Sequence, residues 1–132
     1  MRIPQIPASS ITKKVEAGVY SLKLSKQSYD KHVLGTFDYE RYRRSREKKG
    51  YPPQGILTIS MDEAQKIILE KSGTGIIKVQ QDGSPMDLEW ITCDKTIGKY
   101  YDKGRYHDSC KAIIFHGKRG SHIVPQKGSH YD

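Results

Sequence analysis

The pattern of hydrophobic and polar positions follows a helical period in the first half of the chain and a strand period in the second. The clearest helical signal covers residues 61–71. Ser60 and Glu63 form a capping box there, and aliphatic side chains up to Ile68 recur at helical spacing. Gly73 then provides a residue of the type that ends helices. The sequence therefore predicts an amphipathic helix over residues 61–71.

Three further helix-like segments precede this one, at residues 11–17, 20–30 and 37–49. The first follows two serines that can cap it. The third is dominated by Arg, Lys and Glu with almost nothing aliphatic, which predicts either a solvated helix or a mobile basic loop. Residues 1–9 contain two prolines and read as an extended leader or linker. We therefore expect one folded domain over residues 10–132.

After the helix at 61–71 the period changes to the alternation typical of strands. Short runs of β-branched, aliphatic and aromatic residues are separated by turns that contain glycine. The expected strands cover residues 75–79, 88–93, 97–101, 111–116 and 121–124. Helices first and hairpin-linked strands afterwards predict an α+β fold, with N-terminal helices packed on a twisted antiparallel β-sheet.

Composition adds a strong positive charge to this picture. The 132 residues include 23 Lys and Arg against 15 Asp and Glu, for a net charge of +8. Basic residues predominate in 11–55 and 95–132, and acidic residues in 56–94. This distribution suits a polyanionic partner, whether nucleic acid, an anionic membrane surface or an acidic protein, although solubility alone explains it equally well. The apolar runs are too short for a transmembrane span.

Metal and cofactor chemistry is not expected from this sequence. Cys93 and Cys110 form no Cys-x-x-Cys pair, and no group of His and Cys has the spacing of zinc ligands. The acidic residues match no loop that binds divalent cations. We therefore expect no metal and no cofactor.

Histidines are the main candidates for proton transfer, because their charge changes near neutral pH. They stand at His32, His107, His116, His122 and His130. Strand alternation places His122 with Val124 on the face opposite Ser121 and Ile123. His116 ends the preceding strand, so a hairpin can bring it close to His122. A single histidine is more often structural than catalytic, but the basic surroundings here favour a role in phosphate chemistry.

Aromatic and basic residues also alternate in a way that is typical of RNA contacts. Cations suit the phosphate backbone, whereas tyrosine rings suit stacking on bases. The candidate RNA-binding residues are Arg41, Arg43, Arg44, Arg46, Lys48, Lys49 and Tyr100. The run at 41–49 is equally compatible with a solvated charged helix. The turn Ser72–Gly73–Thr74–Gly75 follows a helix, so it is either a helix C-cap or a backbone turn that meets a phosphate.

Four motifs, in order along residues 28–127, resemble those of the bacterial polymorphic toxin type 50 domains. They are Lys31–His32–Val33–Leu34–Gly35–Thr36 with Tyr39, Ser72–Gly73–Thr74–Gly75, Asp94–Lys95–Thr96–Ile97–Gly98–Lys99–Tyr100–Tyr101–Asp102, and Gly120–Ser121–His122–Ile123–Val124–Pro125. The resemblance implies the fold of the barnase/EndoU/colicin/RelE-like superfamily. It also implies a metal-independent endoribonuclease with transfer RNA as the expected substrate.

The resemblance further implies which residues carry the reaction. The positions that match the family's motif residues are His32, Thr36, Tyr39, Thr74 and His122. We expect His32 and His122 to act as base and acid, in either order. His116, in a stretch that departs from the family pattern, is a substitute for either. Lys31 or Lys95 would stabilise the charge that develops on the phosphate.

The same resemblance implies a biological setting. The domain would form the C-terminal part of a larger secreted or cell-surface toxin of the contact-dependent inhibition type. It would act in the cytoplasm of the target cell and be neutralised by a cognate immunity protein, expected to be acidic. Two alternatives stay open at this point: a non-catalytic nucleic-acid-binding module, and a structural or interaction domain of a phage particle.

Overall fold

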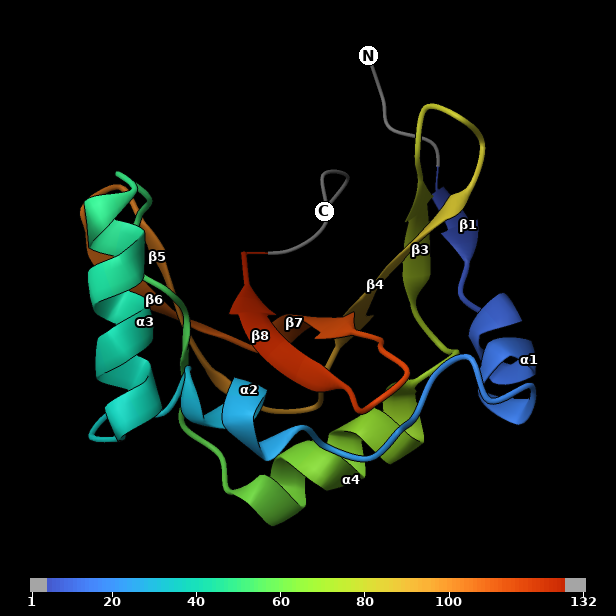
Figure 1. Ribbon diagram of the computed structural model, residues 1–132, viewed down its shortest axis with the longest axis horizontal. Helices are drawn as coiled ribbons and strands as arrows, with labels where there is room; N and C mark the ends of the chain where they lie inside the picture. The colour runs from blue at the N-terminus through green and yellow to red at the C-terminus, as the bar shows by residue number, and fades with distance from the viewer. Residues whose placement is uncertain (1–4, 128–132) are drawn as a thin grey trace.

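The computed structural model describes residues 5–127, which fold as four helices and eight strands (Figure 1). The helices are α1 (Ser10–Glu16), α2 (Lys26–Asp30), α3 (Phe37–Lys48) and α4 (Met61–Lys71). The strands are β1 (Gln5–Pro7), β2 (Ile56–Leu57), β3 (Ile76–Val79), β4 (Pro85–Thr92), β5 (Gly98–Asp102), β6 (Arg105–Ser109), β7 (Lys111–Phe115) and β8 (His122–Gln126). The expected α+β class is confirmed.

The strands form two antiparallel sheets that meet at β8. The larger sheet has the order β1-β3-β4-β7-β8, and the smaller has the order β2-β5-β6. Helix α4 runs along one side of the larger sheet, whereas α3 stands beside β5 and β6 as a separate wall (Figure 1). Strand β8 contacts β2, β5, α2 and α4, so residues on it lie at the junction of both parts.

The main core lies between α4 and the larger sheet. Helix α4 buries Ala64 and Ile68, and the same hydrophobic cluster includes Ile91, Ile114 and Ile123 from three neighbouring strands. The helix begins as predicted, because the Ser60 side chain accepts a hydrogen bond from the backbone N–H of Glu63. One face of each central strand is thereby used for packing, and the opposite face is left for other contacts.

Residues 20–30 differ from the predicted helix. Only Lys26–Asp30 is helical, with Ser25 as its N-cap. The preceding residues are extended instead, because Leu24 forms a bridge to Ser121 next to β8. Tertiary pairing therefore overrides the weak helical signal of this short segment.

The described part of residues 1–9 also belongs to the fold. Gln5–Pro7 pairs as strand β1 with Ile76–Val79, and Ala8 is buried against Ile11. Residues 1–4 lie outside the described residues. The prolines that suggest an extended leader are compatible with an edge strand, which leaves one row of backbone groups unpaired.

Within residues 5–127, no helix is both long enough and apolar enough to cross a membrane. Cys93 and Cys110 are free thiols. They lie on paired backbone, since the N–H of Cys93 donates to the carbonyl of Cys110.

Candidate active site

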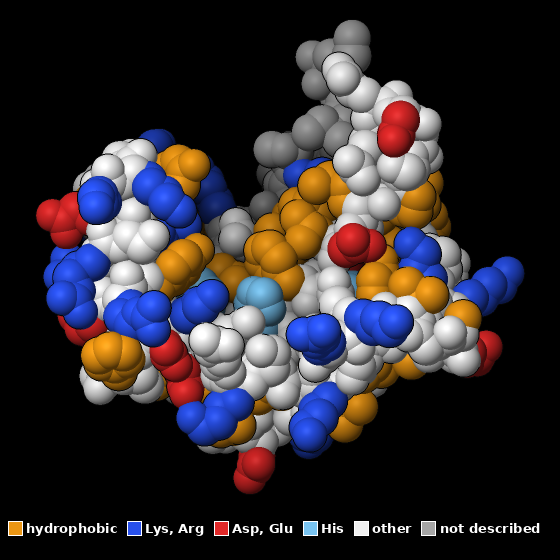
Figure 2. All heavy atoms as spheres, in the orientation of Figure 1, with side chains coloured by type: hydrophobic (Ala, Val, Ile, Leu, Met, Phe, Trp, Pro, Cys, Tyr) orange, Lys and Arg blue, Asp and Glu red, His pale blue; other side chains and the backbone are white. Residues whose placement is uncertain are grey.

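A pocket of about 320 Å³ lies between the wall formed by α3 and β5 and the exposed face of β8. Figure 2 shows the hollow between these two parts of the molecule, with histidine at its floor and Lys and Arg side chains around it. This volume is at the lower end of the range of small-molecule sites, about 300–1,000 Å³. The pocket is therefore large enough for one nucleotide-sized group.

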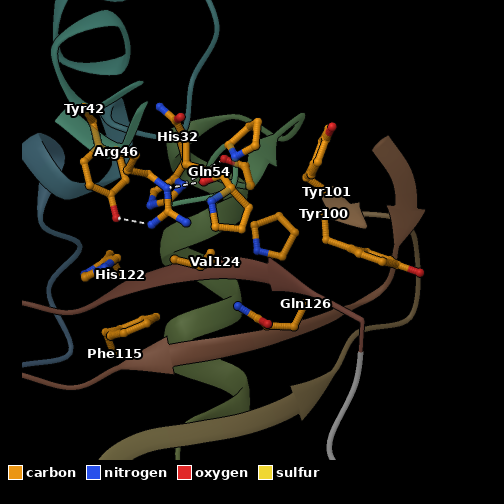
Figure 3. A pocket seen from close by; sticks show the side chains of 14 residues that line it. His32, Tyr42, Arg46, Gln54, Tyr100, Tyr101, Phe115, His122, Val124 and Gln126 are labelled. Carbon is orange, nitrogen blue, oxygen red and sulfur yellow. Dashed lines mark hydrogen bonds between the residues drawn. The ribbon is translucent and has the colours of Figure 1, made fainter. Parts of the chain in front are cut away.

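His32 and His122 lie together in this pocket (Figure 3). Their rings are nearly parallel, with centroids 6.3 Å apart and an interplanar angle of 17°. His32 directly follows the C-cap of α2, and His122 is the first residue of β8. Alternation along β8 places His122 and Val124 on the pocket face and buries Ser121 and Ile123, as the sequence predicts.

A contact with the backbone determines which ring nitrogen of His32 carries the proton. Its Nδ1 lies 2.8 Å from the carbonyl oxygen of Gly55. A carbonyl only accepts hydrogen bonds, so Nδ1 carries the proton and the neutral ring keeps a lone pair on Nε2. Burial lowers the pKa of His32, and the positive charges of Arg46 and Lys31 lower it further, against the effect of the Gly55 hydrogen bond. His32 is therefore neutral at neutral pH.

His122 is held by an aromatic partner. Its ring stacks on Phe115, with centroids 4.7 Å apart and an interplanar angle of 7°. The two residues are directly paired across the β7–β8 hairpin. Burial, followed by the charges of His32 and Lys31, lowers the pKa of His122 to about 4. An anion bound between these groups would raise both histidine pKa values.

Arg46 supplies a fixed positive charge at the pocket. Its Nε donates to the carbonyl of Pro52 at 2.7 Å, and its Nη1 donates to the Tyr42 hydroxyl at 3.2 Å (Figure 3). Its guanidinium also lies 5.5 Å from the centre of the Tyr42 ring and 5.6 Å from that of Tyr51. These contacts restrict the side chain to one position, which favours binding of a phosphate in a defined orientation.

A second positive charge lies next to the pocket. Lys31 lies beside it, with Nζ 5.6 Å from the centre of the Tyr42 ring. Among residues 5–127, those that line the pocket include no Asp or Glu. Across residues 5–127, no three His, Cys, Asp or Glu side chains are grouped as metal ligands. The pocket combines two neutral imidazoles with one cation, Arg46, and Lys31 lies next to it, which suits acid–base chemistry on a phosphodiester.

His116 is placed elsewhere, which corrects the expectation that it substitutes for a pocket histidine. Its Nε2 lies 2.8 Å from the Glu89 carboxylate, and neither side chain is exposed to solvent. Its ring stacks on Tyr20 at 5.2 Å. The reason is alternation: Phe115 pairs with His122 on the pocket face, so the next residue points to the other side of the sheet.

The turn after α4 binds the side-chain carboxylate of Glu89. The N–H groups of Gly73 and Gly75 donate to the Glu89 carboxylate at 2.8–3.1 Å. Thr74 hydroxyl donates to the carbonyl of Lys71 at this turn, outside the pocket. The sequence allowed this turn to be either a helix C-cap or a phosphate contact, and the structure therefore disfavours the phosphate contact.

Thr36 and Tyr39 support the loop that carries His32 and do not line the pocket. The Thr36 hydroxyl caps α3, because it accepts from the Tyr39 N–H at 3.0 Å and donates to the Asp30 carbonyl at 2.6 Å. Lys95 is also outside the pocket, in an ion pair with Glu63. The phosphate-binding and orienting roles expected for Thr36, Tyr39, Thr74 and Lys95 therefore have no support from this geometry.

Helix α3 directs only part of its charge toward the pocket. Among its cations Arg46 lines the pocket, and Arg43 instead pairs with Glu40 and Glu47. The other predicted RNA-binding cations lie outside the pocket lining: Arg41, Arg44, Lys48 and Lys49. Tyr100, predicted as a base-stacking residue, does line the pocket. Arg46 and Tyr100 are therefore the predicted RNA contacts that the fold brings close to the histidines.

Several lining residues were not singled out from the sequence. They include Phe115, Gln126, Gly55, Tyr42, Gln54 and the prolines at 52 and 53. The β7–β8 turn is visible in the sequence, and pairing its strands in the observed register would have identified Phe115 as the neighbour of His122. Gly55 is recognisable only after folding, because its contribution is a backbone carbonyl.

One comparison with known proteins gives a match, to a family model. The family model described as bacterial toxin 50 matches residues 24–125, a range that includes His32, Arg46 and His122. No curated protein and no solved structure gives a significant match. The matched range covers most of the chain, and the chain therefore belongs to the bacterial toxin 50 family.

Proposed function

We propose that this toxin domain is a metal-independent endoribonuclease that cleaves RNA by transesterification. The observation that carries the proposal is the pair of neutral histidines, His32 and His122, facing one pocket beside Arg46. Two imidazoles and a fixed guanidinium are the groups that such a cleavage requires, since it needs a base, an acid and a counter-charge.

His32 is the proposed general base. Its proton is on Nδ1, held by Gly55, so the Nε2 lone pair is available to the pocket. In the first half of the reaction Nε2 takes the proton of a ribose 2′-OH, and the 2′-oxygen forms a bond to the adjacent phosphorus. The lowered pKa of His32 keeps it in the unprotonated form that this step needs.

His122 is the proposed general acid. As the bond between phosphorus and the 5′-oxygen breaks, His122 donates a proton to that oxygen. The products are a 2′,3′-cyclic phosphate and a 5′-hydroxyl end. The negative charge of the bound phosphate raises the pKa of His122 from its value of about 4 in the free protein, so that the acid form is populated when substrate is present.

Arg46 and Lys31 are the proposed counter-charges for the phosphate. Arg46 is restrained by Pro52 and Tyr42, so it needs little reorganisation when negative charge develops on the non-bridging oxygens. Lys31 is close enough to lower the pKa values of both histidines in the free protein, which places its charge within electrostatic reach of the reacting group.

The biological role follows from the family and from this chemistry. The domain would be delivered as part of a larger secreted or cell-surface toxin and would cleave RNA, with transfer RNA as the proposed substrate, in the cytoplasm of a competing cell. The producing cell would need an immunity protein, and an acidic one would complement the positive pocket.

The test is incubation of the purified domain with total bacterial RNA in the presence of a chelator, beside a His122→Ala variant. We expect discrete cleavage products with the wild type only, ending in 2′,3′-cyclic phosphate. Absence of cleavage, with or without added magnesium or cell extract, would contradict the proposal and favour a non-catalytic nucleic-acid-binding module.

A further inference from the structure

The end of the pocket away from Arg46 contains an unused carboxamide, that of Gln126. Alternation along β8 places His122, Val124 and Gln126 on the same face, and all three line the pocket (Figure 3). The backbone of Gln126 is fixed, because it pairs with Lys111 and its carbonyl accepts from the Ser109 hydroxyl. Within residues 5–127 the carboxamide itself makes no hydrogen bond. One N–H₂ donor and one carbonyl acceptor are therefore available to a ligand.

The spacing from the histidines suits a single nucleotide. Gln126 is four residues from His122 on the same strand, which corresponds to about 13 Å between their Cα atoms at a strand rise of about 3.3 Å per residue. Both side chains line the same pocket. A phosphate at the histidines would thus place a base of the adjoining nucleotide near Gln126.

The walls at this end are suited to the flat face of a base. Tyr100 lines the pocket, and its ring stacks on His107 with centroids 5.2 Å apart and an interplanar angle of 20°. His107 is in turn held by a contact of 3.1 Å between its Nε2 and the carbonyl of Asp102. Pro53 adds an exposed apolar side chain to this surface. Aromatic rings in fixed positions are the usual stacking partners of unpaired bases in RNA.

We propose that this end of the pocket is a nucleobase subsite in which Gln126 selects adenine next to the cleaved phosphodiester; the inference rests on the proposed ribonuclease function. A carboxamide pairs through two hydrogen bonds with the N6 amino group and N7 of adenine. Guanine offers two acceptors at the corresponding edge, O6 and N7, so one partner of the carboxamide would be left unsatisfied. At this edge cytosine and uracil each offer a single partner, N4 or O4, so adenine is the base that a carboxamide reading this edge matches best.

The first experiment measures cleavage of short single-stranded RNAs that together contain all sixteen dinucleotide steps. We expect the wild type to cut steps that contain adenine at least about tenfold faster than matched steps without it. Gln126→Glu replaces the donor by an acceptor, so the hydrogen bond to N7 is lost and the preference for adenine should decrease. Gln126→Ala should level the preference while cleavage continues, because the histidines and Arg46 are unchanged.

The matched control is Gln81→Glu, which makes the same change of charge at an exposed position in the β3–β4 turn. This variant should keep the base profile of the wild type. Identical base profiles in the wild type, Gln126→Glu and Gln126→Ala, with cleavage abolished in His122→Ala, would overturn the adenine subsite and leave the ribonuclease function standing.

A binding measurement separates the two proposals when no cleavage occurs. The side-chain amide signals of Gln126, followed by NMR in the full chain, should shift on addition of adenosine 3′-monophosphate and much less with cytidine 3′-monophosphate. Such selectivity without cleavage supports the subsite and counts against the nuclease. Equal shifts with both nucleotides, or no shift at Gln126, overturn the subsite whatever the cleavage result.

Discussion

The rings of His32 and His122 lie 6.3 Å apart and nearly parallel, although one follows a short helix and the other begins the last described strand. Each ring has its own restraint: His32 is bonded to the Gly55 carbonyl, and His122 is stacked on Phe115. Their closeness also couples them electrostatically, since a proton on His32 lowers the pKa of His122. The pair is thus arranged to hold one proton more readily than two.

Alanine substitution of either histidine is expected to remove most of the RNA cleavage. Loss of one positioned acid or base typically lowers the rate by about 10²–10⁴-fold. His122→Ala and His32→Ala should therefore each lower kcat/KM to this extent in a cleavage assay with chelator present. The double variant should lose little more than the worse single variant, because the two residues act as a unit.

The fold provides the control for this prediction. His122 is the first residue of β8 and does not belong to the hydrophobic cluster between α4 and the larger sheet. The far-UV circular dichroism of His122→Ala should therefore match that of the wild type. His32→Ala also loses the Gly55 contact, and His32→Asn is the better-matched variant because its amide can donate to that carbonyl. Full activity in a folded His122→Ala or His32→Asn protein would contradict the assignment.

The pH dependence of kcat/KM should show an acidic optimum. In the free protein the base must be neutral and the acid protonated, and kcat/KM reports these free-protein pKa values. The pKa of His122 is lowered to about 4 and that of His32 is lowered below 6.5. Above the pKa of His32, the protonated fraction of His122 falls about tenfold per pH unit, so kcat/KM should fall in the same way from pH 6 to 8.

The pH profile of kcat should lie at higher pH, because bound phosphate raises both histidine pKa values. Initial rates at constant ionic strength, measured from pH 4.5 to 8.5, separate the two profiles. The residual activity of His122→Ala should lack the decrease above pH 6. A wild-type kcat/KM that is flat or rising between pH 6 and 8 would exclude His122 as the acid.

Sequence reasoning located most elements where local signals are strong. The α4 boundaries, the hairpin turns and the two faces of β8 follow from a capping box, glycine positions and alternation. Strands β2 and β6 were not predicted, because β2 has only two residues and β6 (Arg105–Ser109) is largely polar. Both become strands by pairing with β5, and local periodicity in the sequence does not reveal such pairing.

The candidate site was predictable only in part for a similar reason. His32, His122, Arg46 and Tyr100 were singled out by residue type and motif, and all four line the pocket. His116 was expected near His122 from the hairpin alone, but the register pairs Phe115 with His122 and so turns His116 to the other face of the sheet. Its actual role, a buried contact with Glu89, depends on a strand distant in sequence.

The buried Glu89 carboxylate is expected to be a major determinant of stability. It accepts hydrogen bonds from Gly73 and Gly75 and contacts His116, and its side chain is not exposed. Glu89→Gln places an amide N–H₂ against these donors and should lower the free energy of unfolding by about 3 kcal/mol, at the upper end of the cost of about 1–3 kcal/mol for a buried polar group left without its hydrogen-bond partner. Urea denaturation at pH 7 measures this change.

The matched control for Glu89 is Glu70→Gln. Glu70 is exposed, and its Oε1 lies 3.8 Å from Nζ of Lys66 in an ion pair within α4. Such surface pairs contribute about 0.5 kcal/mol, so this variant should unfold close to the wild-type midpoint. Equal stability of Glu89→Gln and Glu70→Gln would show that the contacts of Glu89 with the turn and with His116 do not stabilise the fold.

Arg46 provides the sharpest test of a fixed counter-charge. Arg46→Lys keeps the positive charge but cannot make both the Pro52 and the Tyr42 hydrogen bonds with the planar geometry of a guanidinium. We expect kcat to fall by about 10–100-fold, because the charge no longer lies at the site where the phosphate becomes more negative.

Arg44→Lys is the matched control for Arg46, because Arg44 lies on the same helix, is exposed and, among the described residues, donates a hydrogen bond to the Glu40 carbonyl alone. The total charge is the same in both variants, so long-range attraction of RNA should be equal. A similar KM and salt dependence in the two variants, with kcat lowered only in Arg46→Lys, would establish that position rather than charge matters. If both variants keep wild-type kcat, Arg46 does not stabilise the reacting phosphate, and its contacts with Tyr42 and Tyr51 serve the pocket's shape alone.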